Sequence, residues 1–422
     1  MHLVSTAALV RPPRSALGRV GRDAAYVFAG RLVALGLAVA TSVVVARRLG
    51  ASGLGDYAVA AGVVMVANVA TSFGTDMVLV RDIAAHGRFE RWGAALVVQL
   101  TLSTVAVGVI AVGAGFVSVA HRQAADAARV LSLSLFPAAA FNVATAVVRG
   151  VGSMRSYAAI GVGAAAASLG AVALAPRLGG VVALAGWLVA AQVASTTLAW
   201  LAAARRAPSL RRRPDLRPSA ALALAKDCGS IGALGLLGVA YQRFGLLVVG
   251  LSNRPVVAGW LSAATRVADA SKTGHVAWFT ALFPSLAADA NADPDERRAR
   301  ARRARRLSVG LGVVVTIGLV TFGPWLTTTL YGPSFAPSRA AVRVLALAVV
   351  PSTVATHQSL ALLVARREIV TLRVLAVCAF VLAVLLAVLV PLLGWIGACW
   401  SVVLAETVHA TLLTRAARRE TS

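Results

Sequence analysis

Long, continuous apolar runs are the feature that most constrains the fold of this chain. Several of them exceed the roughly 18 residues that mark a transmembrane helix. Hydrophobic residues make up 59% of the 422 residues and charged residues only 14%, which excludes both a soluble fold and a disordered chain. The runs do not alternate apolar and polar residues, as the strands of a membrane β-barrel would. The sequence therefore predicts an all-α, polytopic membrane protein.

The apolar runs predict about twelve transmembrane helices. Residues that favour turns separate them, among them Gly50, Pro176 and the pair Gly332-Pro333. The predicted spans are 24–46, 57–80, 94–118, 130–149, 157–175, 181–203, 228–250, 256–287, 307–330, 341–364, 370–391 and 395–414.

The distribution of positive charge predicts the orientation of these spans. The segments on one side carry 29 Lys and Arg residues, those on the other side carry 8, and 4 lie inside spans. Because cytoplasmic loops collect Lys and Arg, both termini are predicted to be cytoplasmic in a protein of the cell membrane. Topology also accounts for the formal net charge of +25. No nucleic-acid partner is expected, since no basic stretch is interleaved with aromatic residues.

A segment rich in Arg and Pro, 204–226, divides six predicted spans from the other six. We interpret it as a basic cytoplasmic linker between an N-terminal lobe, 24–203, and a C-terminal lobe, 227–414. Residues 1–23 and 415–422 are predicted to be cytoplasmic tails.

Two sequence matches indicate that the lobes are internal repeats. Residues 129–137 (RVLSLSLFP) recur as 343–351 (RVLALAVVP), at an offset of 214 with five of nine positions identical. The segment that starts at Gly55 corresponds to the one that starts at Gly259, at an offset of 204. Repeats with six spans each run the same way through the membrane, so a pseudo-two-fold axis along the membrane normal should relate them. The proline that ends each of the two nine-residue segments is predicted to mark a bend inside a span.

Charged residues inside spans are the candidate site residues, because such a residue usually faces a cavity or a partner. We expect Arg31, Arg243, Arg266 and Lys272 to bind an anionic substrate. The alternative is structural: Asp269 shares a helix face with Arg266 and Lys272 and could pair with either. Arg31 lies near the cytoplasmic end of its span and could instead reach the interface.

Acidic residues inside spans are candidates for coupling transport to an ion. They are Asp76, Asp269 and Glu406. Structural pairing is again the alternative, because Asp76 lies near Arg81 and Glu406 lies three residues before His409.

Other polar residues inside spans are expected to form hydrogen bonds between helices rather than to bind ligands. They are Asn68, Asn142, Gln192, His275 and His357.

The sequence contains no pattern of a metal site, a cofactor site or an enzyme. Its three cysteines lack the spacing of metal ligands or of a disulfide framework. No phosphate-binding loop, zinc-binding H-E-x-x-H or nucleophile elbow occurs. We therefore predict neither cofactor nor catalytic residue, and any pumping must draw on an ion gradient, the membrane potential or removal of the product.

Several segments together resemble one family of transporters. The first half contains 46–57 (ARRLGASGLGDY) and 73–84 (FGTDMVLVRDIA), and the second half contains 259–266 (GWLSAATR), 281–284 (ALFP) and 330–335 (LYGPSF). These segments resemble the polysaccharide-biosynthesis flippases, which carry lipid-linked oligosaccharides and belong to the multidrug/oligosaccharidyl-lipid/polysaccharide exporter superfamily.

The resemblance implies a V-shaped pair of six-helix lobes that move polyprenyl-pyrophosphate-linked sugars from the inner to the outer leaflet by alternating access. Arg31 matches an arginine in the first span of related lipid II flippases, and Arg266 matches a basic position common in span eight. The implied partners are the lipid-linked glycan, membrane lipids, and the polymerase and glycosyltransferases of the same pathway. We expect a monomer.

Three other functions are considered. A cation-coupled multidrug exporter of the same superfamily would favour acidic residues in its cavity, whereas the balance inside these spans is basic. A major-facilitator transporter would carry a G-x-x-x-D-R-x-G-R loop, which segment 81–88 does not match. A membrane polysaccharide polymerase or ligase would need a long outer loop, and the predicted outer loops are short.

Overall fold

The computed structural model describes residues 14–116, 119–174, 179–211, 214–252, 254–287, 294–364 and 367–419. Within these residues the regular structure is entirely helical, which confirms the predicted fold class. The helices are α1 (Arg14–Ser72), α2 (Thr75–His86), α3 (Arg91–Gly113), α4 (Arg122–Ser132), α5 (Leu135–Gly150), α6 (Met154–Leu174), α7 (Val181–Arg206), α8 (Pro218–Ser252), α9 (Pro255–Ala287), α10 (Pro294–Tyr331), α11 (Ser338–Ala346), α12 (Val349–Val364), α13 (Glu368–Leu393) and α14 (Trp395–Arg419).

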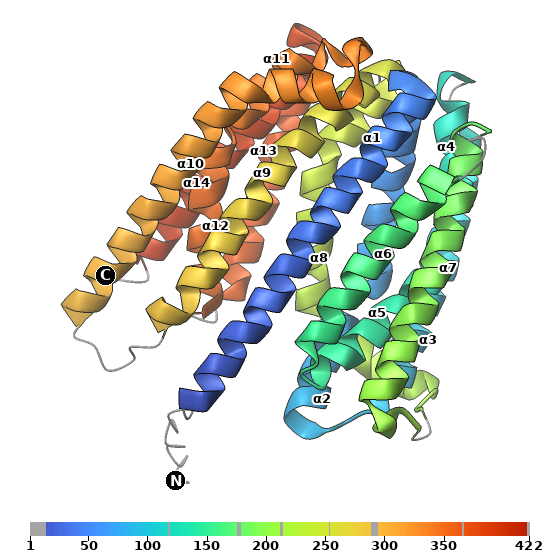
Figure 1. The fold of residues 1–422 in the computed structure, drawn as a ribbon, viewed down its shortest axis with the longest axis vertical. Coiled ribbons are helices and arrows are strands. Elements are labelled where there is room, and N and C mark those ends of the chain that lie inside the picture. Colours follow the sequence, from blue (N-terminus) through green and yellow to red (C-terminus); the bar gives the residue numbers. More distant parts are fainter. Residues whose placement is uncertain are drawn as a thin grey trace.

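The helix α1 contains two of the predicted spans. Its backbone leaves the helical region at Gly50, with φ 70° and ψ −172°, a conformation that glycine adopts without a steric penalty. The chain rises from the N-terminal end of the bundle to Gly50 and then returns to α2 (Figure 1). We call the end of the bundle that holds Arg14 and α2 the terminal face, and the end that holds Gly50 and α11 the distal face.

The helices account for the predicted spans, apart from their exact ends. Among the described residues, eight helices are long and apolar enough to cross a membrane, and two bent pairs bring the number to ten. One of the eight is α1, which holds two predicted spans. Helix α9 coincides with the predicted span 256–287 but is not among these ten. The predicted linker is shorter than expected, because α7 extends to Arg206 and α8 begins at Pro218.

The two bent pairs occupy equivalent positions in the two halves of the chain. Helices α4 and α5 are separated at residues 133–134 and bent by 47°, and α11 and α12 are separated at 347–348 and bent by 43°. The second break lies 214 residues after the first, which is the offset between the two matching sequence segments. This agreement supports the internal repeat. The predicted bend inside each of these spans is present, and the proline follows it directly. Pro137 and Pro351 lie in the first turn after each break, where proline removes no helical hydrogen bond.

Helix α8 packs on both halves of the molecule. Near the terminal face it contacts the first half: a Cβ at Gly232 would lie 2.7 Å from the carbonyl oxygen of Phe73. Cys228 belongs to the same buried cluster as Val78 and Leu79. Asp215, just before α8, donates its backbone N–H to the carbonyl oxygen of Glu90 over 3.0 Å. The first part of α8 therefore packs on helices of the first half.

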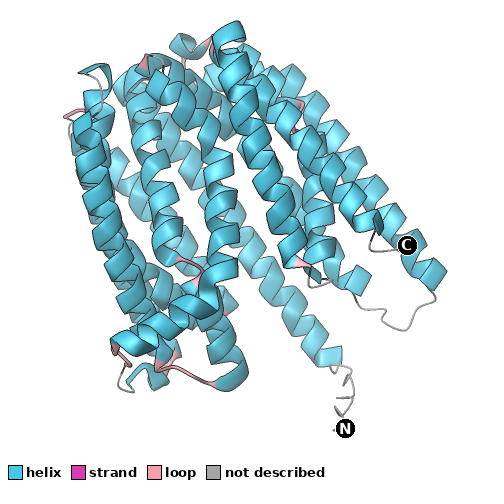
Figure 2. Cartoon of the chain, turned by 180° about the vertical axis from the view of Figure 1, so that it is seen from behind, coloured by secondary structure: helices cyan, strands magenta, loops and turns pink. Residues whose placement is uncertain are grey.

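The two halves also meet at the distal face, where α1 crosses α9. A Cβ added at Gly55 would overlap the carbonyl oxygen of Pro255, and one added at Gly259 would overlap the carbonyl oxygen of Ala51. The two contacts are equivalent under the offset of 204, because Ala51 corresponds to Pro255 and Gly55 corresponds to Gly259. By contrast, α9 and α10 diverge from α2 and α5 at the terminal face, as Figures 1 and 2 show.

Candidate functional site

A cavity of about 610 Å³ lies between α1 and the second half of the molecule. Its wall is formed by residues of α1, α8, α9, α11, α12, α13 and α14. Among the described residues, four charged ones line it, and all four were predicted on different spans to be site residues: Arg31 on α1, Arg243 on α8, Asp269 on α9 and Glu406 on α14. The rest of the wall is mainly apolar and includes Leu246, Leu261 and Val402.

Arg243 is a half-buried cation in the wall of this cavity. Its Nε atom is buried and has no hydrogen-bond partner among the described residues. Arg266 on α9 lies close enough to repel its charge, and Asp269 attracts it. The nearest compensating acid therefore comes from a neighbouring helix, which the sequence of α8 alone could not reveal.

The other predicted cations are placed differently from one another. Arg31 is exposed and lines the cavity, and Arg266 is half-buried next to Arg243 without lining the cavity itself. Within the described part of the chain, neither Arg31 nor Arg266 forms an ion pair. The alternative that Asp269 pairs with Arg266 or Lys272 stays a prediction. The side chain of Lys272 lies outside the described residues, as does that of His275.

Glu406 is part of a small polar cluster beside the cavity. Its Oε2 atom is 3.9 Å from Nδ1 of His409, and the two side chains are 12% and 14% exposed. The two side chains are thus close in space, but neither ring nitrogen of His409 has a hydrogen-bond partner among the described residues, so their pairing stays a prediction. The ring of Tyr241 on α8 meets the ring of His409 edge to face, with centroids 6.1 Å apart. Tyr241 also lines the cavity, so the cluster joins α8 to α14 at its wall.

These side chains give the cavity a chemistry suited to an amphiphilic anion. Two guanidinium groups line it and a third is adjacent, against the two carboxylates of Asp269 and Glu406. Guanidinium groups bind phosphate oxygens through two parallel hydrogen bonds. Apolar walls next to such groups suit a ligand that combines a charged head group with hydrocarbon.

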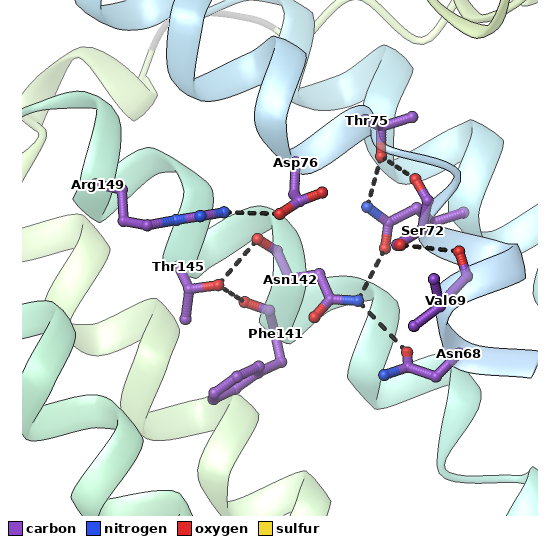
Figure 3. Close-up of polar contacts among 10 residues, drawn as sticks. Asn68, Val69, Ser72, Thr75, Asp76, Phe141, Asn142, Thr145 and Arg149 are labelled. Carbon is purple, nitrogen blue, oxygen red and sulfur yellow. Dashed lines mark hydrogen bonds and ion pairs between the residues drawn. The ribbon is translucent and has the colours of Figure 1, made fainter. Parts of the chain in front are cut away.

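Asp76, the remaining predicted acid, lies elsewhere. Nη2 of Arg149 on α5 donates to Oδ2 of Asp76 on α2 over 2.8 Å, as Figure 3 shows. The expected pairing of Asp76 with Arg81 was wrong; Arg81 instead lies 3.7 Å from Asp82. Arg149 also lies over the ring of Tyr157 on α6, 5.5 Å from its centroid. This arrangement joins three helices of the first half.

A second polar network in the first half was only partly predicted. The amide nitrogen of Asn142 donates to Oδ1 of Asn68 and to Oε1 of Gln99, each over 3.4 Å (Figure 3). Nε2 of Gln99 donates to Oγ1 of Thr75 over 2.8 Å. The expected hydrogen bonding of Asn68 and Asn142 between helices is confirmed. Gln99 was missed, although a glutamine in an apolar run was the signal that could have revealed it.

No cluster of metal-ligating side chains occurs among the residues that the structure describes. The three cysteines are separate and buried.

Two family models match the sequence. The family described as "Polysaccharide biosynthesis protein" matches residues 44–340, and the family described as "Lipid II flippase MurJ" matches residues 274–422. A search of curated proteins found no match.

Solved structures of transporters share the fold at low sequence identity. A structure titled "Lipid II flippase MurJ, inward closed conformation" has a TM-score of 0.73 at 11% identity and covers 93% of this chain and 87% of that chain. An inward-facing multidrug resistance MATE family transporter of the MOP superfamily has a TM-score of 0.67 at 15% identity, with 92% and 94% covered. A MOP superfamily transporter from Pyrococcus furiosus, described as having a binding pocket of reverse polarity, is also similar. Its TM-score is 0.66 at 15% identity, with 95% of each chain covered.

These comparisons agree with the helical architecture and with the resemblance seen in the sequence. The structural likeness shows that the chain has the fold of MOP superfamily transporters. The first family model extends over more than half of the 422 residues, so the chain belongs to the polysaccharide biosynthesis protein family.

Proposed function

We propose that this protein is a flippase that moves a polyprenyl-pyrophosphate-linked oligosaccharide from the inner to the outer leaflet of the cell membrane. The observation that carries the proposal is the cavity itself. Arg31 and Arg243 line it, and neither forms an ion pair among the described residues. Cations without partners inside a membrane protein are costly unless they face water and meet an anion.

A pyrophosphate head group fits these requirements. Its oxygens accept paired hydrogen bonds from guanidinium groups, and its charge offsets the repulsion between Arg243 and Arg266. Binding of the head group also favours one conformational state over the other, as alternating access requires. This is because the arginines come from both halves, from α1 in the first and from α8 and α9 in the second.

The arrangement of the lobes supports an inward-open state. The lobes meet at the distal face through Gly55 and Gly259, and α9 and α10 diverge from α2 and α5 at the terminal face. The excess of Lys and Arg in the segments of the terminal face supports its assignment as the cytoplasmic side. A polyprenyl tail can remain in the lipid between the diverging helices while the head group enters the cavity.

Glu406 and Asp269 are the acids through which transport could be coupled to an ion, because both line the cavity. The ion pair of Asp76 with Arg149 favours a structural role for Asp76.

A cation-coupled multidrug exporter is the second candidate. The similarity to a MATE family transporter and the presence of two acids in the cavity favour it. The unpaired arginines favour the flippase, because they would repel a cationic drug. A polymerase or ligase has less support, because the solved structures that share the fold are transporters.

Reconstitution distinguishes the two candidates. Purified protein in vesicles should move a fluorescent polyprenyl-pyrophosphate-linked sugar between leaflets and should not accumulate a cationic dye. Arg31→Ala and Arg243→Ala should each lower lipid movement, and Arg343→Ala, which removes an exposed arginine at the distal face, should not. Dye accumulation that survives both alanine substitutions, without lipid movement by the unmodified protein, would favour the exporter.

A further inference from the structure

Two consecutive arginines at the distal end of the first span contact helix ends in different halves of the molecule. Arg47 and Arg48 lie in α1 just before Gly50. They belong to the few basic residues on the side of the membrane that is poor in Lys and Arg, so topology gives no reason for their presence. The transport cavity does not use them either.

Arg48 holds α1 to the first half. Its Nη1 and Nη2 atoms donate to the carbonyl oxygens of Val172 and Ala173, each over 2.8 Å. These two residues lie in the last turn of α6, whose terminal carbonyls have no partner within the helix. Near the other end of the span, Gly30 packs directly against Ala158 of α6. The first span is therefore fixed to α6 along its length.

Arg47 holds the same span to the second half. Its Nε atom donates to the carbonyl oxygen of Leu330 over 2.9 Å, and Nη2 donates to that of Thr329 over 3.0 Å. Both acceptors lie in the last turn of α10. One turn before Arg47, Ser42 and Tyr331 share a buried hydrogen bond of 2.9 Å.

The two contacts have the same chemistry. In each, a planar guanidinium fork spans consecutive carbonyls at a helix C-terminus, where the helix dipole also favours a cation. They differ in the relation of the two parts they join. Arg48 joins two helices of the first half, and Arg47 joins the first half to the second.

We infer that the contact of Arg47 with α10 holds the distal face closed, and we call this contact the latch. The contact of Arg48 with α6 is permanent. The guanidinium of Arg47 closes on the end of α10 when the cavity opens to the terminal face, and it must release α10 before the cavity opens to the distal face. The guanidinium of Arg48 stays on α6 in both states. This inference rests on the alternating access of the proposed function and does not depend on the transported substrate.

Distances between spin labels test the inference with two matched variants. Cysteines at Leu174 and Leu392, both exposed at the distal ends of α6 and α13, carry the labels after the three native cysteines have been replaced by alanine. A second pair, at Phe116 and Leu174, lies within the first half and checks that this half stays folded.

Arg47→Gln should increase the population with the longer distance between Leu174 and Leu392 by roughly tenfold, the effect of losing a charge-assisted contact. Arg48→Gln should leave this population unchanged, and Arg47→Lys should fall between them because lysine lacks the fork. The distance between Phe116 and Leu174 should not change in Arg47→Gln.

The latch is refuted if Arg47→Gln leaves the distances of the unmodified protein unchanged, or if both glutamine variants shift them equally. These outcomes are distinguishable from failure of the proposed function. If Arg47→Gln opens the distal face while Arg243→Ala still exports glycan, the latch stands and the proposed substrate site does not.

Discussion

At the distal face, the backbone of α1 at Gly55 contacts the backbone of α9 at Gly259. A Cβ at either position would overlap a backbone carbonyl oxygen of the opposite helix. Backbone atoms cannot rotate away as a flexible side chain can. The crossing therefore exists only with glycine at both positions, and it fixes how closely the two lobes approach on this side.

Replacing Gly55 with alanine should destabilise this closed crossing. Overpacking of this kind typically costs about 1–3 kcal/mol, and Gly55→Ala should lower the unfolding temperature of the detergent-solubilised protein accordingly. Gly108→Ala on α3 is the control, since a Cβ there meets no atom within 4 Å. Equal unfolding temperatures for the two variants would show that the helices do not cross at Gly55.

Orientation in the membrane can be tested with single cysteines. Arg217→Cys and Arg303→Cys place exposed thiols at the terminal face, and Arg343→Cys places one at the distal face. In whole cells an impermeant thiol reagent should label only Arg343→Cys, because the terminal face is expected to be cytoplasmic. Labelling of the other two variants without lysis would reverse the assignment.

The contact between Asp76 and Arg149 should contribute to the stability of the first half. Both side chains are partly shielded, with 27% and 20% exposed, and their atoms are 2.8 Å apart. Asp76→Asn and Arg149→Gln should each lower the unfolding temperature, and the double variant should cost less than the sum of the two. The coupling free energy should lie between about 0.5 and 3 kcal/mol. Additive effects would mean that the two groups do not interact.

Glu406 should matter for energy coupling more than for substrate binding. If its carboxylate carries the coupling ion, Glu406→Gln should retain exchange of the lipid down its gradient and lose transport driven by an imposed ion gradient in vesicles. Glu90→Gln, an exposed acid at the terminal face, is the control and should retain both activities. Driven transport by Glu406→Gln at the normal rate would assign coupling to another group.

The sequence predicted those features of the fold that leave a local pattern. Apolar runs located the spans, and the match of 129–137 with 343–351 located two breaks that the structure places at the same offset. The path of α8 between the halves left no such pattern, because it depends on packing between Gly232 and Phe73, which are far apart in the sequence. Such contacts are set by tertiary structure rather than by local periodicity.

The candidate site could be predicted residue by residue but not as an arrangement. The cost of a charge inside a span identified Arg31, Arg243 and Glu406, and the structure brings all three to one cavity. The partners of charged groups were harder to predict, since the nearest charge in the sequence is not the nearest in space. Asp76 pairs with Arg149, 73 residues away, rather than with Arg81.

The central claim is that Arg243 receives the anionic head group of a lipid-linked glycan. The most direct test measures lipid-linked precursor and surface polysaccharide in cells whose only copy of the protein carries Arg243→Ala, with Arg343→Ala as the control at equal protein level. We predict loss of surface polysaccharide and accumulation of precursor in the inner leaflet for Arg243→Ala, and partial recovery for Arg243→Lys, which keeps the charge but not the fork. Normal polysaccharide export by Arg243→Ala would contradict the account.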